Sequence, residues 1–375
     1  MTLLPLSTND PQAALPRTNA VIENGMQVGL HVGAQIYAAV GNQVRADFGW
    51  GLARPGVPMT ADTVMLWLSS GKPVGAVALL QLVERGLLDL QHPVARYLPE
   101  FAQNGKETIT FWHLLTHTAG FRFVDINWPE SSWDEIIARI CKCKPERDWL
   151  PGQKAGYHPY TSWYILGEAV RRIDGRSYSD YVRQQIFEPL GMRDSWIGVP
   201  AAQYEAYGNR FGIMLHVDKA EPYTHRYDSL EGASVCVPGG NGHGPMHDLG
   251  RFYHMLAGGG TLDGVRILSE QNARLMTTPR RVGMYDQTFK HVMEWGLGTI
   301  IDSNRYGAET VPYGYGVHSS SHTFGHGGAQ SSIGFCDPDH QLVAAVVFNG
   351  MPSERKHDLR MRALLAALYE DLGLA

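Results

Sequence analysis

The chain has 375 residues, of which 44% are hydrophobic, and its formal net charge is -5. This length predicts about two domains or one large composite domain, and the apolar fraction excludes a wholly disordered chain. The composition lacks the basic character of a nucleic-acid binder, and no block of like charges indicates a membrane-binding patch.

The N-terminus and the cysteines indicate the compartment. The sequence shows no basic start followed by an apolar run of signal-peptide length, and no apolar stretch reaches the ~18 residues of a membrane span. We therefore expect a cytoplasmic protein without a membrane partner. Four cysteines are too few for a disulfide scaffold in a chain of this length, so we expect free thiols.

The first part of the chain predicts a hairpin followed by a long helix. Residues 33–53 contain two β-favouring runs that flank Gly41–Asn42, a pair typical of a hairpin turn. Residues 68–88 carry apolar side chains at helical spacing. Pro73 is tolerated in the first turn of a helix but not further inside, so the helix is expected to begin close to Ser69.

The remainder predicts further helices and a second hairpin. A strand-like entry and a short helix are expected within 108–120, and longer helices are expected at 161–172, 178–188, 245–256 and 355–372. Two β-like runs, 328–336 and 342–349, are joined by the turn signal at 337–339.

Strands at both ends of the chain, with a mostly helical stretch between them, indicate an α+β architecture. We predict a discontinuous sheet domain formed by residues 1–66 and 245–375. Residues 67–244 are predicted to form a mostly helical domain that carries the helix beginning near Ser69.

Ser69 and Lys72 form the first motif that carries chemistry. Residues three apart on a helix share a face, so the two side chains can meet. A serine hydroxyl needs a neighbouring base to become a nucleophile, and burial can lower the pKa of a lysine enough to supply one. A second Ser-x-x-Lys pattern, Ser353 to Lys356, is expected to be the start of the last helix. The apolar segments on both sides of Ser69 distinguish the first copy.

The segment around Ser69, together with residues 83–101 and 108–121, resembles the serine β-lactamase and penicillin-binding-protein superfamily. The chain is most similar to class C β-lactamases and their family VIII-type esterase relatives, over residues 33–372. This resemblance implies a β-lactamase-like fold, an antiparallel sheet flanked by helices with a second, mostly helical region, and an active site between them.

The second family motif, Tyr-x-Asn, matches Tyr157, but Pro159 stands where the family has Asn. The resemblance implies that Tyr157 is the catalytic tyrosine, and Tyr160 is the alternative if the alignment gap is placed differently. A tyrosine beside an ammonium group is expected to have a lowered pKa and to exchange a proton with Ser69 or the leaving group. Lys72 would share protons with both as one coupled set.

The third family motif, Lys-Thr-Gly, matches the segment Gly325 to Gln330, which reads GHGGAQ. The resemblance implies a substrate pocket formed by His326, Gly327 and Gly328, and an oxyanion hole formed by the backbone N–H groups of Ser69 and Ala329. A histidine is mostly neutral near pH 7, whereas the family lysine is a permanent cation. The exchange disfavours substrates that bear a carboxylate, such as penicillins.

Other chemistries are less well supported. His113 and His117 lie four residues apart, but the segment between them lacks the Glu of the H-E-x-x-H pattern. We therefore expect neither a metal site nor a cofactor. The absence of a G-x-S-x-G elbow disfavours an α/β-hydrolase.

We therefore predict a serine acyl-transfer enzyme that acts on a small-molecule ester or acyl substrate. The favoured activity is ester hydrolysis through an acyl-Ser69 intermediate. The alternatives are a transacylase that passes the acyl group to an alcohol or amine, a β-lactamase or D,D-peptidase, and a non-catalytic binding module. The sequence leaves the oligomeric state open.

Overall fold

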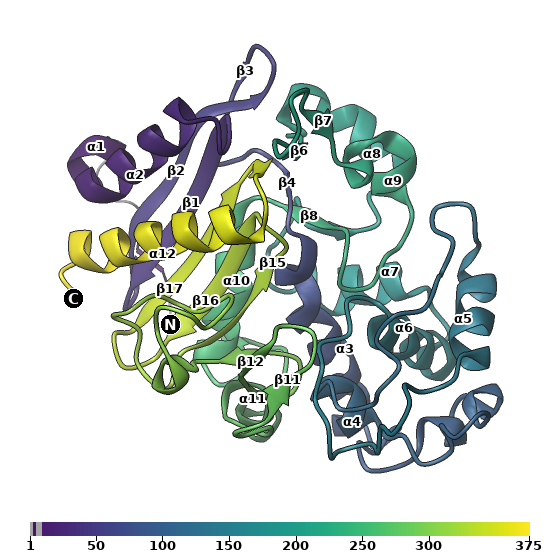
Figure 1. Cartoon of the computed structure of the whole chain (residues 1–375). Helices are drawn as coiled ribbons and strands as arrows, with labels where there is room; N and C mark the ends of the chain where they lie inside the picture. Colours follow the sequence, from purple (N-terminus) through teal and green to yellow (C-terminus); the bar gives the residue numbers. More distant parts are fainter. Residues whose placement is uncertain (1–2, 5–9) are drawn as a thin grey trace.

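The computed structural model describes residues 3–4 and 10–375. Its centre is an eight-stranded sheet, antiparallel throughout, that combines segments from both ends of the chain (Figure 1). In sheet order the strands are β13 (Glu294–Trp295), β14 (Ile300–Ile301), β15 (Phe324–Gly328), β16 (Ser332–Asp337), β17 (Leu342–Phe348), β1 (Gly33–Val40), β2 (Gln43–Arg54) and β3 (Val57–Pro58).

Both predicted hairpins are present. Val40 of β1 pairs with Gln43 of β2, and Asp337 of β16 pairs with Leu342 of β17. One prediction at this edge is wrong: residues 328–336 do not form a single strand. The backbone of Gln330 is left-handed, with φ of 50°, and the turn it makes separates β15 from β16.

The two faces of the sheet are covered by different helices, because successive side chains of a strand point to opposite faces. Alternate residues of β17 (Leu342, Ala344, Val346 and Phe348) pack with α2 (Pro16–Gln27) and α12 (Glu354–Asp371). The residues between them (Val343, Ala345 and Val347) share a core with α10 (Met246–Ala257) and the helices beyond it. Figure 1 shows α12 lying across the sheet, opposite the helical part of the molecule. The predicted α+β fold is confirmed.

The helical part of the chain is built around α3 (Lys72–Glu84). Every residue of α3 from Lys72 to Leu80 is buried, as expected for a helix that is apolar on all sides. The other helices there are α4 (Phe111–Leu115), α5 (Trp133–Lys142), α6 (Thr161–Asp174), α7 (Tyr178–Val182), α8 (Ala201–Tyr207) and α9 (Leu230–Ser234).

The smaller elements complete the chain. They are α1 (Pro11–Ala14), α11 (Glu270–Thr277), β4 (Met65–Leu66), β5 (Trp196–Ile197), β6 (Leu215–His216), β7 (Tyr223–Thr224), β8 (Gly242–Gly244), β9 (Thr261–Leu262), β10 (Val265–Arg266), β11 (Tyr285–Asp286), β12 (His291–Val292) and β18 (Gly350–Met351).

Most helix predictions hold, but one strand prediction and the geometry of one helix are corrected. The predicted strand-like entry near residue 108 is wrong, because it is reduced to one isolated bridge between Pro93 and Thr110. The predicted helix at 178–188 keeps its extent but changes geometry, since α7 continues as a π-helical turn from Arg183 to Phe187. The four cysteines are free, as predicted. The proposed division into two domains stays a prediction.

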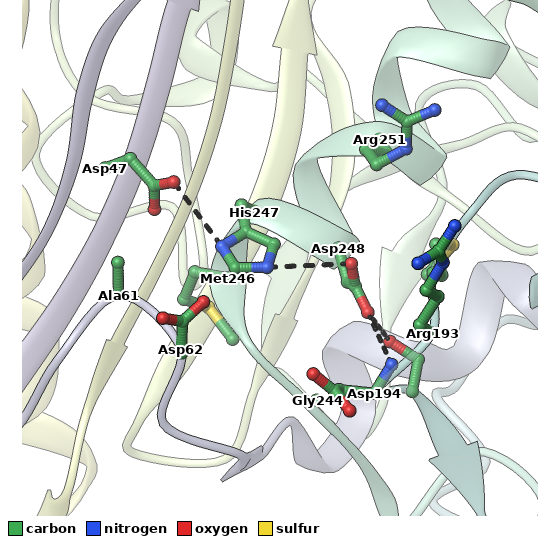
Figure 2. Close-up of polar contacts among 12 residues, drawn as sticks. Asp47, Ala61, Asp62, Arg193, Asp194, Gly244, Met246, His247, Asp248 and Arg251 are labelled. Atoms are coloured by element: carbon green, nitrogen blue, oxygen red, sulfur yellow. Dashed lines mark hydrogen bonds and ion pairs between the residues drawn. The ribbon is translucent and has the colours of Figure 1, made fainter. Parts of the chain in front are cut away.

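A chain of polar contacts ties the sheet to the region between α7 and α8 (Figure 2). His247 Nδ1 lies 3.4 Å from Asp47 Oδ2 on β2, and His247 Nε2 lies 3.7 Å from Asp248 Oδ1. The other oxygen of Asp248 accepts from Ser195 Oγ at 2.8 Å. Burial opposes protonation of His247, but attraction to the carboxylates outweighs it and raises the pKa of the imidazole.

Within the described ranges, no helix combines the length and the apolar character needed to span a bilayer.

Candidate active site

Ser69 lies on a 3₁₀ turn, Leu68–Gly71, between β4 and the first residue of α3. Pro73 occupies the start of α3, as its sequence predicts, and Ser69 is partly exposed while Lys72 is fully buried. The turn is held against the sheet because Ser332 Oγ on β16 donates to the Trp67 carbonyl at 2.6 Å. The fold thus presents the Ser69 hydroxyl at the junction of the sheet and the helical part.

Two predicted side chains, those of Lys72 and Tyr157, meet at this hydroxyl. Lys72 Nζ lies 2.8 Å from Ser69 Oγ, and Tyr157 Oη donates to the same oxygen at 2.8 Å. Lys72 Nζ also donates to the carbonyl of Gly239 at 2.6 Å. Tyr160 instead begins α6 as its N-cap residue and packs against the main core. The geometry therefore favours Tyr157 over Tyr160.

The protonation of these groups follows from their burial. Desolvation lowers the pKa of Lys72 well below its ordinary value, so the amine can be neutral and act as a base. Burial raises the pKa of Tyr157, the Ser69 hydrogen bond opposes this only partly, and Asp286 and Glu354 add to the rise. The expected lowering of the tyrosine pKa is therefore wrong, because desolvation dominates. The resting phenol keeps its proton and can act as a donor.

The strand β15 brings the predicted third motif to the same place. His326, Gly327 and Ala329 line one pocket with Ser69 and Tyr157. His326 is buried, and desolvation together with the nearby Lys72 charge lowers the pKa of its imidazole to about 3. Its Nδ1 lies 2.7 Å from the Gly327 carbonyl, while its buried Nε2 has no hydrogen-bond partner among the described residues. The histidine is therefore neutral.

The glycines of β15 serve packing within the protein. A Cβ at Gly328 would lie 2.4 Å from the carbonyl oxygen of Trp67, and a Cβ at Gly327 would lie 2.4 Å from Cδ1 of Tyr313. Gly327 also lines the pocket beside Ser69, and a substrate-binding role for Gly327 and Gly328 stays a prediction. Ser69 and Ala329 border the same pocket, and an oxyanion role for their N–H groups stays a prediction.

Two residues that sequence reasoning missed hold Tyr157 in place. Asp286 Oδ1 accepts from the Tyr157 backbone N–H at 3.1 Å, and its other oxygen accepts from Arg281 at 3.0 Å in a fully buried ion pair. The ring of His117 lies 4.9 Å from the Tyr157 ring, and His117 Nδ1 accepts from the His158 backbone at 3.0 Å. Neither role has a local sequence signal, because both partners are distant along the chain.

His113 and Ser353 have structural roles. His113 Nδ1 accepts from the backbone N–H of Thr110 at 3.1 Å, so it caps α4 and does not face the same site as His117. In the described part of the chain, no cluster of three His, Cys, Asp or Glu side chains is arranged for a metal ion. Ser353 precedes α12, where Lys356 is exposed, as the second Ser-x-x-Lys pattern predicted.

Exchange of Asp286 for alanine removes the acceptor of the Tyr157 backbone N–H and is expected to lower kcat on the order of 10²-fold, because a shift of ~1 Å in a reacting group has this effect. It should also reduce the free energy of unfolding by about 3–5 kcal/mol, because Arg281 loses its buried partner. Arg281→Gln is the matched control: it breaks the same ion pair but keeps the carboxylate that accepts from Tyr157. Urea unfolding and steady-state kinetics measure both. Equal loss of kcat in the two variants would contradict a positioning role for Asp286.

Known proteins are similar to this chain in sequence and in fold. The Beta-lactamase family model matches residues 18–368. The Esterase/beta-lactamase LipL of Mycobacterium tuberculosis is 27% identical over 333 residues, which cover 81% of this chain and 73% of the relative. The Esterase EstB of Burkholderia gladioli is 31% identical over 251 residues, and the match spans only 62% of each chain.

Solved structures of similar proteins superpose on almost the full length of this chain. A penicillin-binding protein homologue from Caulobacter crescentus superposes with a TM-score of 0.78 at 29% identity, covering 99% of both chains. A family VIII carboxylesterase superposes with a TM-score of 0.76 at 26% identity, also covering 99% of both chains. These matches confirm the resemblance seen in the sequence: the chain belongs to the beta-lactamase family and is a serine hydrolase.

Proposed function

We propose that this serine hydrolase is a carboxylesterase that works through an acyl-Ser69 intermediate. The observation that carries the proposal is the double contact at Ser69 Oγ, which lies 2.8 Å from both Lys72 Nζ and Tyr157 Oη. One neighbour can take the serine proton and the other can give a proton to the leaving group. Both stand beside a pocket whose lining includes no permanently charged side chain.

Acylation begins when neutral Lys72 takes the proton of Ser69 and the hydroxyl oxygen attacks the ester carbonyl. The backbone N–H groups of Ser69 and Ala329 would stabilise the negative oxygen of the tetrahedral intermediate. As the C–O bond breaks, Tyr157 gives its proton to the departing alkoxide and regains one from the Lys72 ammonium. The alcohol leaves, and every proton is accounted for.

Deacylation uses the same groups in the same order. A water molecule gives a proton to Lys72 and attacks the acyl carbonyl. When the second intermediate collapses, Ser69 leaves as the alcohol and regains its proton through Tyr157, which is restored by Lys72. The Gly239 carbonyl, 2.6 Å from Lys72 Nζ, holds the amine in position throughout.

An uncharged ester is supported over a β-lactam or a peptide with a free carboxylate. His326 occupies the motif position where the resembled family has a lysine, and its pKa of about 3 keeps it neutral. A carboxylate entering this pocket would lose its hydration without gaining a cation on β15, which is costly. Of the two relatives named above, EstB is called an esterase and LipL an esterase/beta-lactamase, so both names include ester hydrolysis.

Intact-protein mass spectrometry after incubation with a panel of small esters tests the proposal. We expect a mass increase equal to the acyl group, carried on the peptide that contains Ser69, followed by release of the acid. Capture of the acyl group by an added alcohol or amine in preference to water would indicate a transacylase. Turnover of a chromogenic cephalosporin in preference to the esters would indicate a β-lactamase, and neither labelling nor turnover would indicate a binding module.

A further inference from the structure

The pocket beside Ser69 is small and ends at an aromatic wall. Its volume is about 40 Å³, and its apolar lining includes Phe289, Ile300 and Tyr313. A buried water molecule needs ~10–15 Å³ of such space, so the pocket has room for roughly three non-hydrogen atoms, each about the size of a water molecule. Only a short substituent of the ester fits inside it.

A second cavity lies on the other side of Tyr313. It has a volume of about 10 Å³ and lies beneath α12, where Ile333 and Met361 contribute apolar walls. Tyr313 is the one residue that lines both spaces. Its ring is therefore a partition that separates the catalytic pocket from this second cavity, which His357, Asp358 and Arg362 also line.

The Tyr313 ring is held in place from several sides. Its hydroxyl donates to Glu354 Oε2 at 2.6 Å, at the start of α12. Its ring centroid lies 5.6 Å from that of Phe289, and a Cβ at Gly327 would lie 2.4 Å from Cδ1 of the Tyr313 ring. Because these contacts fix the ring, the partition does not depend on a bound substrate.

A row of aromatic rings links the Tyr157 hydroxyl to this wall. A proton donor must lie within hydrogen-bond reach of the oxygen it protonates, so the departing alcohol lies next to Tyr157 Oη. The Tyr157 ring packs against Phe289 at 4.8 Å, and Phe289 packs against Tyr313. A row of three rings thus leads from the proton donor to the partition.

We propose that Tyr313 sets the size of the alcohol portion of the ester and that wild-type enzyme prefers esters of small alcohols. This inference rests on the proposed esterase function. The acyl portion extends to the other side of the scissile carbonyl and is not limited by Tyr313.

Two series of esters test the assignment in Tyr313→Ala, with Tyr313→Phe as the matched control that keeps the ring and loses the hydroxyl. The first series varies the alcohol (methyl, butyl and octyl acetate), and the second varies the acid (methyl acetate, butyrate and octanoate). Acid release in a pH-stat gives kcat/KM for each. We expect Tyr313→Ala to raise the butyl-to-methyl ratio by about 10-fold or more, the scale on which a pocket discriminates methylene groups. Tyr313→Phe should keep the wild-type ratio, and the acid series should keep its wild-type order in both variants.

Each other outcome contradicts a defined part of the inference. An unchanged butyl-to-methyl ratio in Tyr313→Ala would show that Tyr313 does not limit the size of the alcohol. A change confined to the acid series would show that the acyl portion, and not the alcohol, lies against Tyr313. Tyr313→Leu, expected to give an intermediate ratio, replaces alanine if that variant does not fold. Failure of the esterase function looks different, because wild-type enzyme would then hydrolyse no ester in either series and Ser69 would not be acylated.

Discussion

Replacing Ser69 with alanine is expected to abolish acyl-enzyme formation and to lower kcat/KM for an ester by at least ~10³-fold. The magnitude is that of removing a nucleophile whose partners act as one unit, so that the remaining groups cannot compensate. The Ser69 side chain is partly exposed and accepts from two neighbours, so the variant should fold. Intact mass after ester incubation and steady-state kinetics measure the two effects.

The adjacent hydroxyl provides the control for this experiment. Ser70 is buried, and its Oγ lies 2.9 Å from Ser332 Oγ, which has a second partner in the Trp67 carbonyl. Ser70→Ala should therefore keep both labelling and turnover. Acyl-enzyme formation in Ser69→Ala, or its loss in Ser70→Ala alone, would refute the assignment of the nucleophile.

Replacing Lys72 with methionine is expected to lower kcat/KM by a comparable factor, on the order of 10³-fold or more, because Ser69 then has no base. Methionine keeps the apolar volume of the buried stem, so the effect reports the amine. Lys356→Ala, in the exposed second Ser-x-x-Lys pattern, is the matched control and should keep full activity. Wild-type rates in Lys72→Met would show that another group activates the serine.

The pH dependence of the wild-type enzyme carries the same information. Only the neutral amine can accept the Ser69 proton, so kcat/KM should rise with pH as Lys72 loses its proton and then level off. Burial lowers the pKa of Lys72 well below its ordinary value of 10.5, so the plateau should be reached far below that pH. A rise that continues to the ordinary lysine value would contradict a desolvated base.

The sequence predicted the parts of the fold that depend on local patterns. The hairpin turn at Gly41–Asn42 and the helices α6, α10 and α12 follow from period, turn residues and end signals within short windows. The short strands β13 and β14 carry no such pattern. They exist because β14 pairs with β15 and β13 pairs with β14, and only the folded chain brings these partners together.

The candidate site shows the same division. Ser69 and Lys72 are three residues apart, so their contact could be inferred from helical spacing alone. Asp286 contacts the backbone of Tyr157, which is 129 residues away in the sequence, and no local pattern predicts such a contact. The pKa of Tyr157 could not be predicted either, because its direction depends on how completely the surrounding chain excludes water.

The anchor of the lysine has a consequence for how this chain can vary. Gly239 has a left-handed backbone, with φ of 74°, and a Cβ there would lie 2.7 Å from Cγ of Lys72. The acceptor of the Lys72 amine is a main-chain carbonyl oxygen. Every amino acid has this oxygen, so a substitution at position 239 does not remove the acceptor. Position 239 is therefore constrained by its left-handed backbone and by the lack of space for a side chain, so any relative that keeps this chemistry is expected to keep glycine there.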